Sequence, residues 1–404
     1  MQQSAVPSHV PPELVWNGDL SAFAEAHSDP YVALSEEFHA GPDIRWVTNM
    51  MHGRQGWFLT RQDLQTEVFV APQTFSSRRA SDLTEMLGVG WRMIPNEQDP
   101  PVHMMYRQVL QPWFQPSAVT RLEEGMRAIC RSLLDNFAEK GECDFCEEFG
   151  LLFPSQIFLQ LMGLPYSLVD QFLAWEHVIV RGETPEARIG ALRAVLDYLT
   201  TYMMEKRRGP IEDNLASHIA TAQVKGRLLT DDEVMGMALV LYVGGLDTVA
   251  SSVGWYLMHL ARNPDLQERL RQNPELIPAA VEELLRAHGV TITMREVMQD
   301  LDFHGVEMRA GDIVALPQFL ASRDERAFPD PHRIHLDRKA RHITLATGPH
   351  NCLGAHLARR EIKIVLEEWL ARFHNIRIPD ESAINWQAPG VWGVTRLPLA
   401  WDLA

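Results

Sequence analysis

The chain has 404 residues, of which 46% are hydrophobic and 22% are charged, a balance typical of folded globular proteins and not of disordered or collagen-like chains. Its 53 acidic and 37 basic side chains give a net charge of −16, which repels phosphate backbones and argues against nucleic acid as a partner. No run of about 18 uninterrupted apolar residues is present, so we expect no membrane-spanning helix.

The N-terminal segment is rich in proline and has no basic start followed by an apolar run, so we expect residues 1–13 to be loose and no signal peptide. Helical periodicity predominates in the rest of the chain. It predicts helices at 33–40, 61–70, 101–112, 117–139, 154–163, 167–180, 186–207, 212–223, 231–262, 264–271, 275–287 and 353–373. Shorter strand patterns occur at 44–48, 56–59, 294–298, 301–303, 307–309, 313–316 and 391–400. No linker-like run is evident, which predicts one domain over residues 1–404, mainly α with a small β region.

The predicted helix at 231–262 is apolar almost throughout and is broken only at Gly244-Gly245 and Asp247-Thr248. At 1.5 Å per residue it would be about 45 Å long, enough to cross the whole molecule. A helix that is apolar on nearly all sides must be buried on nearly all sides. Acidic residues at its start suit the positive end of the helix dipole, and Pro264 ends it.

A cysteine loop at 347–354 precedes the helix predicted at 353–373. Cys352 stands where backbone N–H groups and the helix dipole favour thiolate over thiol. Gly348 and Gly354 permit sharp turns and a close approach to a flat ligand. A thiolate presented in this way is one of the few protein ligands of heme iron. The alternative is a partly buried cysteine with no chemistry.

The long predicted helix contains two adjacent glycines, which cost roughly 2 kcal/mol of helix stability relative to alanine. Gly244 and Gly245 would let a large ligand lie against the helix. Thr248 can bond a carbonyl one turn back and open the helix locally. With Asp247 it makes an acid–alcohol pair suited to a proton relay. The alternative is a packing notch beside a surface acid.

Two further pairs of polar residues lie on predicted helices. Glu283 and Arg286 are three residues apart on one face. His103 and Arg107 are one turn apart, just after the sequence Asp-Pro-Pro at 99–101, and two such donors suit a carboxylate or a propionate. Alone, each pair would more commonly be a solvated helix face.

Together and in this order, these motifs resemble the cytochrome P-450 superfamily over residues 14–402. The segment 321–331, Ala-Ser-Arg-Asp followed by Phe-Pro-Asp-Pro, stands between the Glu-x-x-Arg pair and the cysteine loop, as it does in that family. The runs 244–249 and 352–362 are most similar to the bacterial camphor-hydroxylase group. The resemblance implies a helical prism with a long central helix over heme b, with O2 as co-substrate and a monooxygenase activity.

The resemblance also implies residue roles. Cys352 would be the axial thiolate of the iron, and Asp247 with Thr248 would supply protons for oxygen activation. Glu283 and Arg286 would be structural and would tie the helical core to the region of Arg333. The residues implied in cofactor binding are His103, Arg107, Arg295, His350, Cys352, Gly244 and Gly354.

The family's substrate pocket implies a further set of positions. These are Trp91, Met93, Asn96, Val240, Val243, Gly244, Thr291, Thr293 and Val391. Trp91 stands where camphor-type relatives carry a Tyr hydroxyl that anchors a ketone, and an indole offers a donor only. We therefore expect a small apolar terpenoid or norisoprenoid, ionone-like more than camphor. The alternative is that Trp91 points away from the heme and packs the loop.

Electrons would come from NAD(P)H through a reductase and a [2Fe–2S] ferredoxin, because 404 residues leave no room for a flavin or nicotinamide domain. We expect the ferredoxin to dock at basic residues around the cysteine loop, with Arg61 nearby. They are Arg338, Lys339, Arg341, Arg359, Arg360 and Lys363. The alternative is a solvated helix surface, with Arg359 or Arg360 internal.

Two other functions are considered for the protein. One is a heme-thiolate peroxygenase or isomerase, but such enzymes generally lack the acid–alcohol pair. The other is a heme redox or gas sensor, which would predict an appended signalling segment.

Three features of the sequence depart from the family pattern or compete with it. Leu345-Ala346 replaces the usual Phe-Gly ahead of the cysteine, which weakens shielding of the thiolate while leaving ligation intact. Thr293 stands where relatives often carry an acidic group. Cys143 and Cys146 have zinc-type spacing but lack further ligands nearby, so we interpret them, like Cys130, as structural thiols on a short strand. Four cysteines in all fit a reducing cytoplasm.

Overall fold

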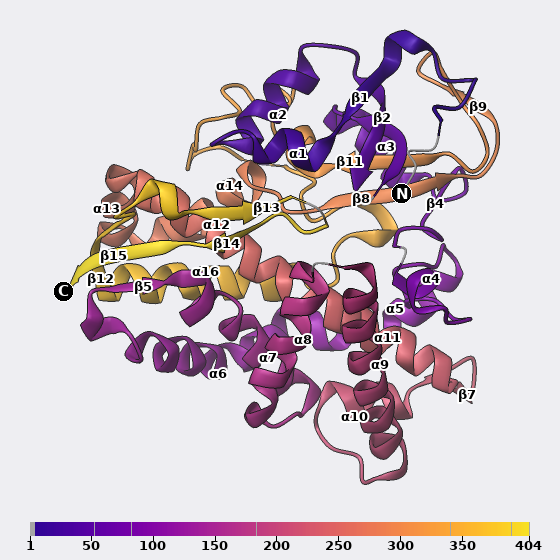
Figure 1. The fold of residues 1–404 in the computed structure, drawn as a ribbon. Helices are drawn as coiled ribbons and strands as arrows, with labels where there is room; N and C mark the ends of the chain where they lie inside the picture. The colour runs from indigo at the N-terminus through magenta and orange to yellow at the C-terminus, as the bar shows by residue number, and fades with distance from the viewer. Residues whose placement is uncertain are drawn as a thin grey trace.

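The computed structural model describes residues 5–403 except 52, 82, 183, 340 and 389. Helices form most of the molecule, and the strands gather mainly at one end (Figure 1). The helices are α1 Leu20–Glu25, α2 Pro30–His39, α3 Gln62–Val70, α4 Leu83–Leu87, α5 Val102–Phe114, α6 Pro116–Asp135, α7 Leu152–Met162, α8 Val169–Arg181, α9 Pro185–Arg208, α10 Leu215–Thr221, α11 Asp231–Gly245, α12 Asp247–Arg262, α13 Pro264–Gln272, α14 Ile277–Ala287, α15 Gln318–Ala321 and α16 Ala355–Arg372. The mainly α fold expected from the sequence is confirmed.

The largest of the β-sheets joins segments that are far apart in the sequence. Its strand order is β1-β2-β3-β11-β8-β4, so the indigo N-terminal strands lie beside orange strands from the second half of the chain (Figure 1). The strands of the molecule are β1 Val15–Asp19, β2 Ile44–Met51, β3 Arg54–Leu59, β4 Phe75–Ser76, β5 Glu142–Asp144, β6 Gln223–Val224, β7 Arg227–Leu228, β8 Ile292–Val297, β9 Leu301–Phe303, β10 Val306–Met308, β11 Ile313–Pro317, β12 Phe373–Arg377, β13 Asn385–Gln387, β14 Gly393–Arg396 and β15 Pro398–Leu403.

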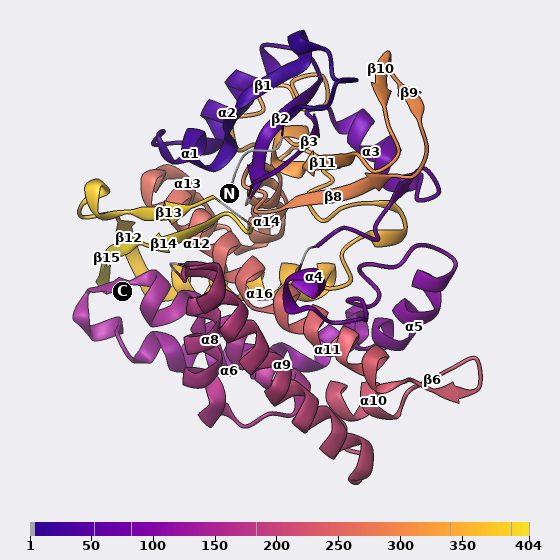
Figure 2. The same ribbon diagram turned by 45° about the vertical axis from the view of Figure 1, so that its right-hand side comes forward.

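The predicted long helix is present as two helices in succession, α11 and α12, with Leu246 between them. The start of α11 is fixed by a capping box, in which the Thr230 hydroxyl accepts from the Glu233 N–H and the Glu233 carboxylate accepts from the Thr230 N–H. The pair passes through the middle of the molecule (Figure 2). Asp231–Arg262 is long and apolar enough to cross a membrane by composition alone, but 61% of its most apolar window is buried inside the protein, as in the core helix of a globular fold.

The beginning of the chain is more ordered than the sequence suggests. Val10 is buried at 5% exposure, and His9 Nε2 lies 2.9 Å from Asp312 Oδ2, which also accepts from the Trp57 indole. Residues 1–4 lie outside the described part of the chain. The N-terminal segment expected to be loose is therefore packed against the sheet from about residue 9 onward.

The Cys-x-x-Cys segment is only partly a strand. Strand β5 ends at Asp144, and Cys146–Gly150 forms a turn of π-helix that leads into α7. Cys130, Cys143 and Cys146 are buried, and the Cys146 thiol donates to the Val394 carbonyl at 3.2 Å. Within the described residues, no group of three or more His, Cys, Asp or Glu side chains is placed to hold a metal ion.

Candidate active site

A cavity of about 270 Å³ lies beside the junction of α11 and α12. Cys352 lines it from the loop before α16, and Gly244 with Thr248 lines it from the helix junction. His103 and Arg107 line it from α5. The cysteine, the opened helix and the nitrogen-bearing side chains of α5 therefore border one and the same space.

The cysteine loop is held in shape by its own backbone. The Cys352 N–H donates to the Leu345 carbonyl at 2.8 Å, and Gly348 adopts φ of +68° where a Cβ would lie 2.9 Å from the Phe69 carbonyl oxygen. Only glycine fits that turn. Burial raises the pKa of the Cys352 thiol, against a lowering effect of the Gly354 N–H and the charges of Arg107 and Arg359. The Gly354 N–H at the helix end and the two arginines thus lower the pKa in the direction expected from the sequence, and burial opposes them.

The acid–alcohol pair opens the helix in the expected way. Thr248 Oγ1 donates to the Gly244 carbonyl at 2.8 Å, one turn back, and α11 ends at Gly245. A Cβ added at Gly244 would meet no atom within 4 Å, so the helix surface is open there. Asp247 Oδ1 accepts from Ser251 Oγ at 3.1 Å. Thr248 lines the Cys352 cavity, whereas Asp247 lines two other cavities. The two side chains thus face different spaces.

Four nitrogen-bearing side chains lie at or near the Cys352 cavity: His103, Arg107 and His350 line it, and Arg295 lies near His350. The His103 and His350 rings lie 4.1 Å apart, and the buried Nδ1 of His103 has no hydrogen-bond partner. Among the described residues, none of the four forms an ion pair with a carboxylate. Such a set of donors without a carboxylate partner fits a ligand that carries two carboxylates, as the propionates of heme do.

The electrostatics of this set support the same ligand. Burial, assisted by Arg107 and Arg295, lowers the pKa of His103 to about 4. Burial and Arg295 lower the pKa of His350 to about 2, and burial lowers the pKa of Arg295 to about 10. Arg295 does not itself line the cavity. It lies over the Phe69 ring and donates to the Met294 carbonyl at 2.8 Å. A dianionic group here would offset the desolvation of the two arginines and raise the pKa values of the two histidines.

Comparison with known proteins identifies the family. A sequence profile described as Cytochrome P450 matches residues 187–398. The protein named Probable cytochrome P450 127A1, from Sinorhizobium fredii (strain NBRC 101917 / NGR234), is 36% identical over 99% of this chain and 98% of its own. The chain belongs to the cytochrome P450 family. The family holds heme b through a cysteine thiolate and uses O2 as co-substrate.

The solved structures of two P450s resemble the whole molecule. Those of CYP101C1 and CYP101J2 each superpose with a TM-score of 0.89, at 31% and 30% identity. They cover 98% and 99% of this chain and 100% of their own chains. The expected P450 fold, the resemblance to bacterial class I P450s and the monooxygenase activity of the family are confirmed at this level.

The Glu-x-x-Arg pair of this P450 is fully buried, and it reaches the region of Arg333, as the resemblance implies, through the Arg333 carbonyl. Arg286 Nε lies 2.9 Å from Glu283, and its other nitrogens donate to the carbonyls of Ser322, Pro331 and Arg333. Arg333 therefore contributes only its carbonyl, because its side chain is exposed. The guanidinium that reaches Glu283 belongs to Arg338, at 3.2 Å. The sequence could not distinguish the two arginines, since both follow the same Pro-rich segment.

The nine proposed substrate positions are distributed over several places. Asn96, Val240 and Gly244 line the Cys352 cavity, while Val243 and Val391 line a neighbouring cavity of about 110 Å³. The other four line neither of these cavities. Met93 is buried in a small cluster with Leu87, Leu192 and Leu239, and Trp91 packs against that cluster. The Thr293 hydroxyl bonds to the side-chain amide of Gln318 at 2.5 Å, and Thr291 precedes the same strand.

Several residues that line the Cys352 cavity were not found from the sequence. They include Leu110, Phe114, Ile157, Phe158, Leu161, Met162, Leu215 and Val249. They come from helices that periodicity predicted correctly, namely α5, α7, α10 and α12. Periodicity identifies the buried face of a helix but not which space that face borders. Only the packing of the helices against one another shows that these residues line the Cys352 cavity.

The basic residues around the cysteine loop are mostly engaged in ion pairs. Arg359 bonds Glu282 at 2.5 Å, Arg360 pairs with Glu123, and Lys363 lies 3.3 Å from Glu367. Arg338 is occupied by Glu283, as described above. Lys339 and Arg341 are exposed, and neither forms an ion pair with a described residue.

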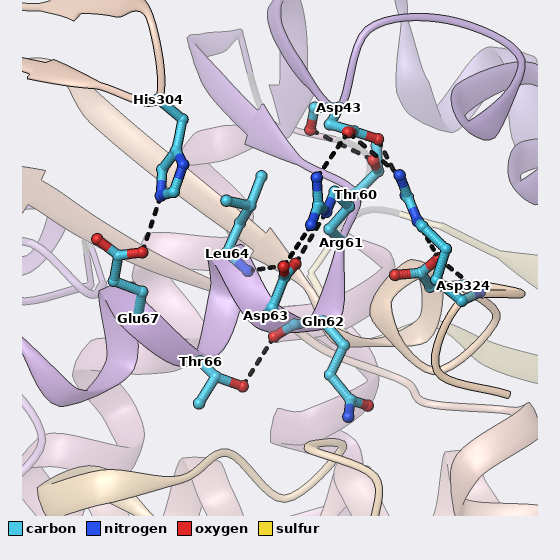
Figure 3. A network of polar contacts seen from close by, with 11 residues as sticks. Asp43, Thr60, Arg61, Gln62, Asp63, Leu64, Thr66, Glu67, His304 and Asp324 are labelled. Atoms are coloured by element: carbon cyan, nitrogen blue, oxygen red, sulfur yellow. Dashed lines mark hydrogen bonds and ion pairs between the residues drawn. The ribbon is translucent and has the colours of Figure 1, made fainter.

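Arg61, which we expected near this loop, is held between two carboxylates (Figure 3). Its Nη1 donates to Asp43 at 3.3 Å and its Nε to Asp63 at 2.9 Å. Its neighbour Gln62 donates to the Arg341 carbonyl at 3.3 Å, so the start of α3 does lie beside the loop. The charge of Arg61 is nevertheless matched by acids and adds little to the positive field there.

Proposed function

We propose that this P450 binds heme b beside Cys352 and hydroxylates a small apolar molecule, using O2 and electrons from a [2Fe–2S] ferredoxin in the cytoplasm. When bound, heme supplies the chemistry of oxygen activation. The observation that carries the proposal is that Cys352, Thr248 and the donors His103, Arg107 and His350 line one cavity. Cys352 would give up its thiol proton on binding iron, because metal ligands bind in their deprotonated form.

The protein's own part in turnover is to hold the cofactor and to deliver protons. Arg107, Arg295 and the two histidines would hold the propionates, which suits the fixed fork of an arginine. Asp247 and Thr248 adjoin each other at the helix junction but line different cavities. A proton taken up by Asp247 on one side can therefore be passed to the Thr248 hydroxyl on the other.

One experiment tests the ligand and the relay together. Cys352→Ala should abolish the red-shifted Soret band of the reduced carbonyl complex that gives the family its name. Thr248→Ala should keep that band and substrate binding, but should divert electrons to peroxide and slow product formation. Thr248→Ser, which keeps the hydroxyl, is the matched control and should remain largely coupled. A normal band in Cys352→Ala, or full coupling in Thr248→Ala, would show that these assignments are wrong.

The substrate we propose is a compact terpenoid or norisoprenoid, ionone-like more than camphor. The cavity walls are mostly aliphatic or aromatic, with Val240, Leu241 and Val249 next to the open surface at Gly244. Apolar contacts discriminate by only about 1–3 kcal/mol per methylene, so such a pocket selects by size and shape. Related P450s take larger molecules, since one solved relative, EryK, holds erythromycin B. The small substrate therefore rests on the lining residues and not on the family.

Spectral titration with camphor and β-ionone tests the substrate class. We expect β-ionone to give the larger low-spin to high-spin shift in the wild-type protein. Val240→Ala should weaken its binding by about 5- to 30-fold, since it removes two methyl groups from the wall. Trp91→Ala decides between the two positions considered for the indole. A weaker shift supports contact with the substrate, and an unchanged one assigns Trp91 to packing against α4 and α9. Tight camphor binding by the wild-type protein would refute the proposed class.

For the redox partner, we propose that the ferredoxin docks beside the cysteine loop. A hollow there is lined by residues of α6, α14 and α16, including His356, Arg360 and Lys363. Lys339 and Arg341 are the exposed cations of the adjoining loop. A local positive patch on a protein of net charge −16 would steer an acidic partner to this face.

A further inference from the structure

A buried glutamate stands behind the acid–alcohol pair. Glu176, on α8, is 6% exposed and lines two cavities that are separate from the Cys352 cavity. Asp247 lines both of the same two cavities, which measure about 30 Å³ and 110 Å³. The carboxyl groups of Glu176 and Asp247 therefore border the same two cavities between α8 and the helix junction. No motif in the sequence singles out Glu176.

The surroundings of Glu176 keep its carboxyl group neutral. Burial, and then the charge of Asp247, raise the pKa of Glu176 to about 8, whereas Tyr242 on α11 has a smaller lowering effect. The Tyr242 hydroxyl faces the carboxyl group without forming a hydrogen bond of normal geometry. In the described part of the chain, the other charged or titratable groups that line these cavities are Arg188 on α9, the exposed His177 on α8 and the buried Cys146 thiol. Among the described residues, Glu176 forms no ion pair, so a proton is its means of neutralisation.

A serine hydroxyl forms a hydrogen bond with the Asp247 carboxyl group that borders these cavities. Ser251 Oγ donates to Asp247 Oδ1 at 3.1 Å. A Cβ added at Gly393 of β14 would lie 2.4 Å from that hydroxyl, so the strand closes tightly over Ser251. Asp247 is thus fixed where it borders the space shared with Glu176, while its neighbour Thr248 borders the space shared with Cys352.

We propose that Glu176 is a positioning residue that holds a proton and returns it to Asp247 after Asp247 has passed one towards Thr248. The proton leaves the Glu176 carboxyl and joins the Asp247 carboxylate. The carboxylate left on Glu176 then takes a proton from solvent that enters the adjoining cavity. This role rests on the proposed relay and extends it by one group, from the helix junction to α8.

Infrared difference spectroscopy tests the protonation of Glu176 without turnover. The wild-type holoenzyme should show the C=O stretch of a neutral carboxylic acid that disappears as the pH rises through about 8. Glu176→Gln should lack that band, and His177→Gln, which alters the adjacent residue of the same cavity, should keep it. A band that still disappears near pH 8 in Glu176→Gln would assign that titration to another residue and overturn the proposal, whereas a band unchanged across this pH range belongs to the second buried acid, Glu361, whose pKa is raised by burial.

Turnover tests whether that proton is used. Glu176→Gln is nearly isosteric with the neutral acid and should bind substrate normally, yet its coupled product formation should fall about tenfold, less than the 10²–10⁴-fold of a direct general acid. The wild-type rate should decline as the pH rises through about 8, because Glu176 then has no proton to give. The Gln variant should show no decline in that window and a larger solvent isotope effect. Glu176→Asp should restore part of the rate.

Failure of this role can be distinguished from failure of the relay. If Thr248→Ala and Asp247→Asn uncouple the enzyme while Glu176→Gln keeps the wild-type rate and pH profile, the relay stands and the role of Glu176 is refuted. If Thr248→Ala and Asp247→Asn remain fully coupled, the relay itself is refuted, and the extension to Glu176 fails with it.

Discussion

Ala346 adopts a backbone conformation that glycine would adopt at lower cost. Its φ is +57°, in the left-handed region, and the Ala346 N–H donates to the Ile343 carbonyl at 2.8 Å. Asn351 Nδ2 donates back to the Ala346 carbonyl at 3.2 Å, so the turn is fixed from both ends. An L-residue other than glycine pays about 1–2 kcal/mol there. The Leu-Ala sequence ahead of the cysteine therefore keeps the loop's shape and stores strain in it.

Ala346→Gly should stabilise the enzyme. The relief of left-handed strain exceeds the extra backbone entropy of glycine in the unfolded chain, about 0.4–1 kcal/mol, so we expect a net gain of about 0.5–1 kcal/mol. Urea unfolding of the holoenzyme, followed by far-UV circular dichroism, measures the difference. Ala174→Gly on the exposed face of α8 is the matched control and should lose about 1 kcal/mol. Equal losses in both variants would contradict the strain at Ala346.

At this same scale, the sequence predicted residues that carry a motif and missed those that do not. Thr248 was expected to bond a carbonyl one turn back, and it does so at Gly244. Glu176 was missed, because a glutamate in an amphipathic helix gives no sign of being buried. Trp91 was aligned with a substrate contact, yet it packs against a hydrophobic cluster beside the cavity. Side-chain direction in a loop depends on neighbours that a single sequence does not name.

At the scale of elements, helices were predicted more completely than strands. The helix expected at 186–207 is observed as α9, Pro185–Arg208. Its bounds were predictable because a Thr cap followed by proline marks its start and a glycine follows its end. The short strands β1 and β12 were missed. Val15–Asp19 contains Asn-Gly, which reads as a turn, and Phe373–Arg377 directly follows a long helix. Each is stabilised by pairing with a distant strand, β2 and β15 respectively, which local propensity cannot register.

The link between α14 and the irregular segment after α15 depends on Arg338 and not on Arg333. Arg338 donates to Glu283, to the Pro329 carbonyl and to the Asp330 carbonyl, and its side chain is only 12% exposed. Arg338→Met would leave a fully buried carboxylate with one cation instead of two, and we expect a loss of about 3 kcal/mol in the free energy of unfolding. Heme content after purification should fall with it.

Arg333→Met is the control for that prediction. It removes an exposed guanidinium and keeps the carbonyl to which Arg286 donates, so its effect should stay within about 0.5 kcal/mol. Urea unfolding of the two variants side by side gives the comparison. The assignment of Arg338 fails if the two variants lose equal stability, and the family-based assignment of Arg333 is restored if the order is reversed.

At the scale of the whole molecule, the net charge and the local distribution of charge have opposite effects on the encounter with an acidic ferredoxin. A net charge of −16 repels an acidic ferredoxin at long range, so productive encounter needs a face where the local field is positive. Most arginines around the cysteine loop are paired with glutamates in the structure, which leaves Lys339 and Arg341 as the exposed cations of the loop that form no ion pair with a described residue. Two charges are enough to orient a partner but not to bind it tightly.

Reversal of those two charges should therefore slow reduction by ferredoxin without changing the enzyme. We expect Lys339→Glu with Arg341→Glu to lower the second-order rate about tenfold at low salt, and the difference should shrink as ionic strength rises and the Debye length falls to about 8 Å. Arg269→Glu with Arg333→Glu is the control, since it changes net charge by the same amount in a hollow beside His259, lined by α12 and α13. Stopped-flow reduction of the carbonyl-trapped enzyme by a bacterial [2Fe–2S] ferredoxin measures both. Equal slowing by the two double variants would mean that net charge alone governs the encounter, and salt-independent reduction of the wild-type enzyme would exclude electrostatic docking at this face.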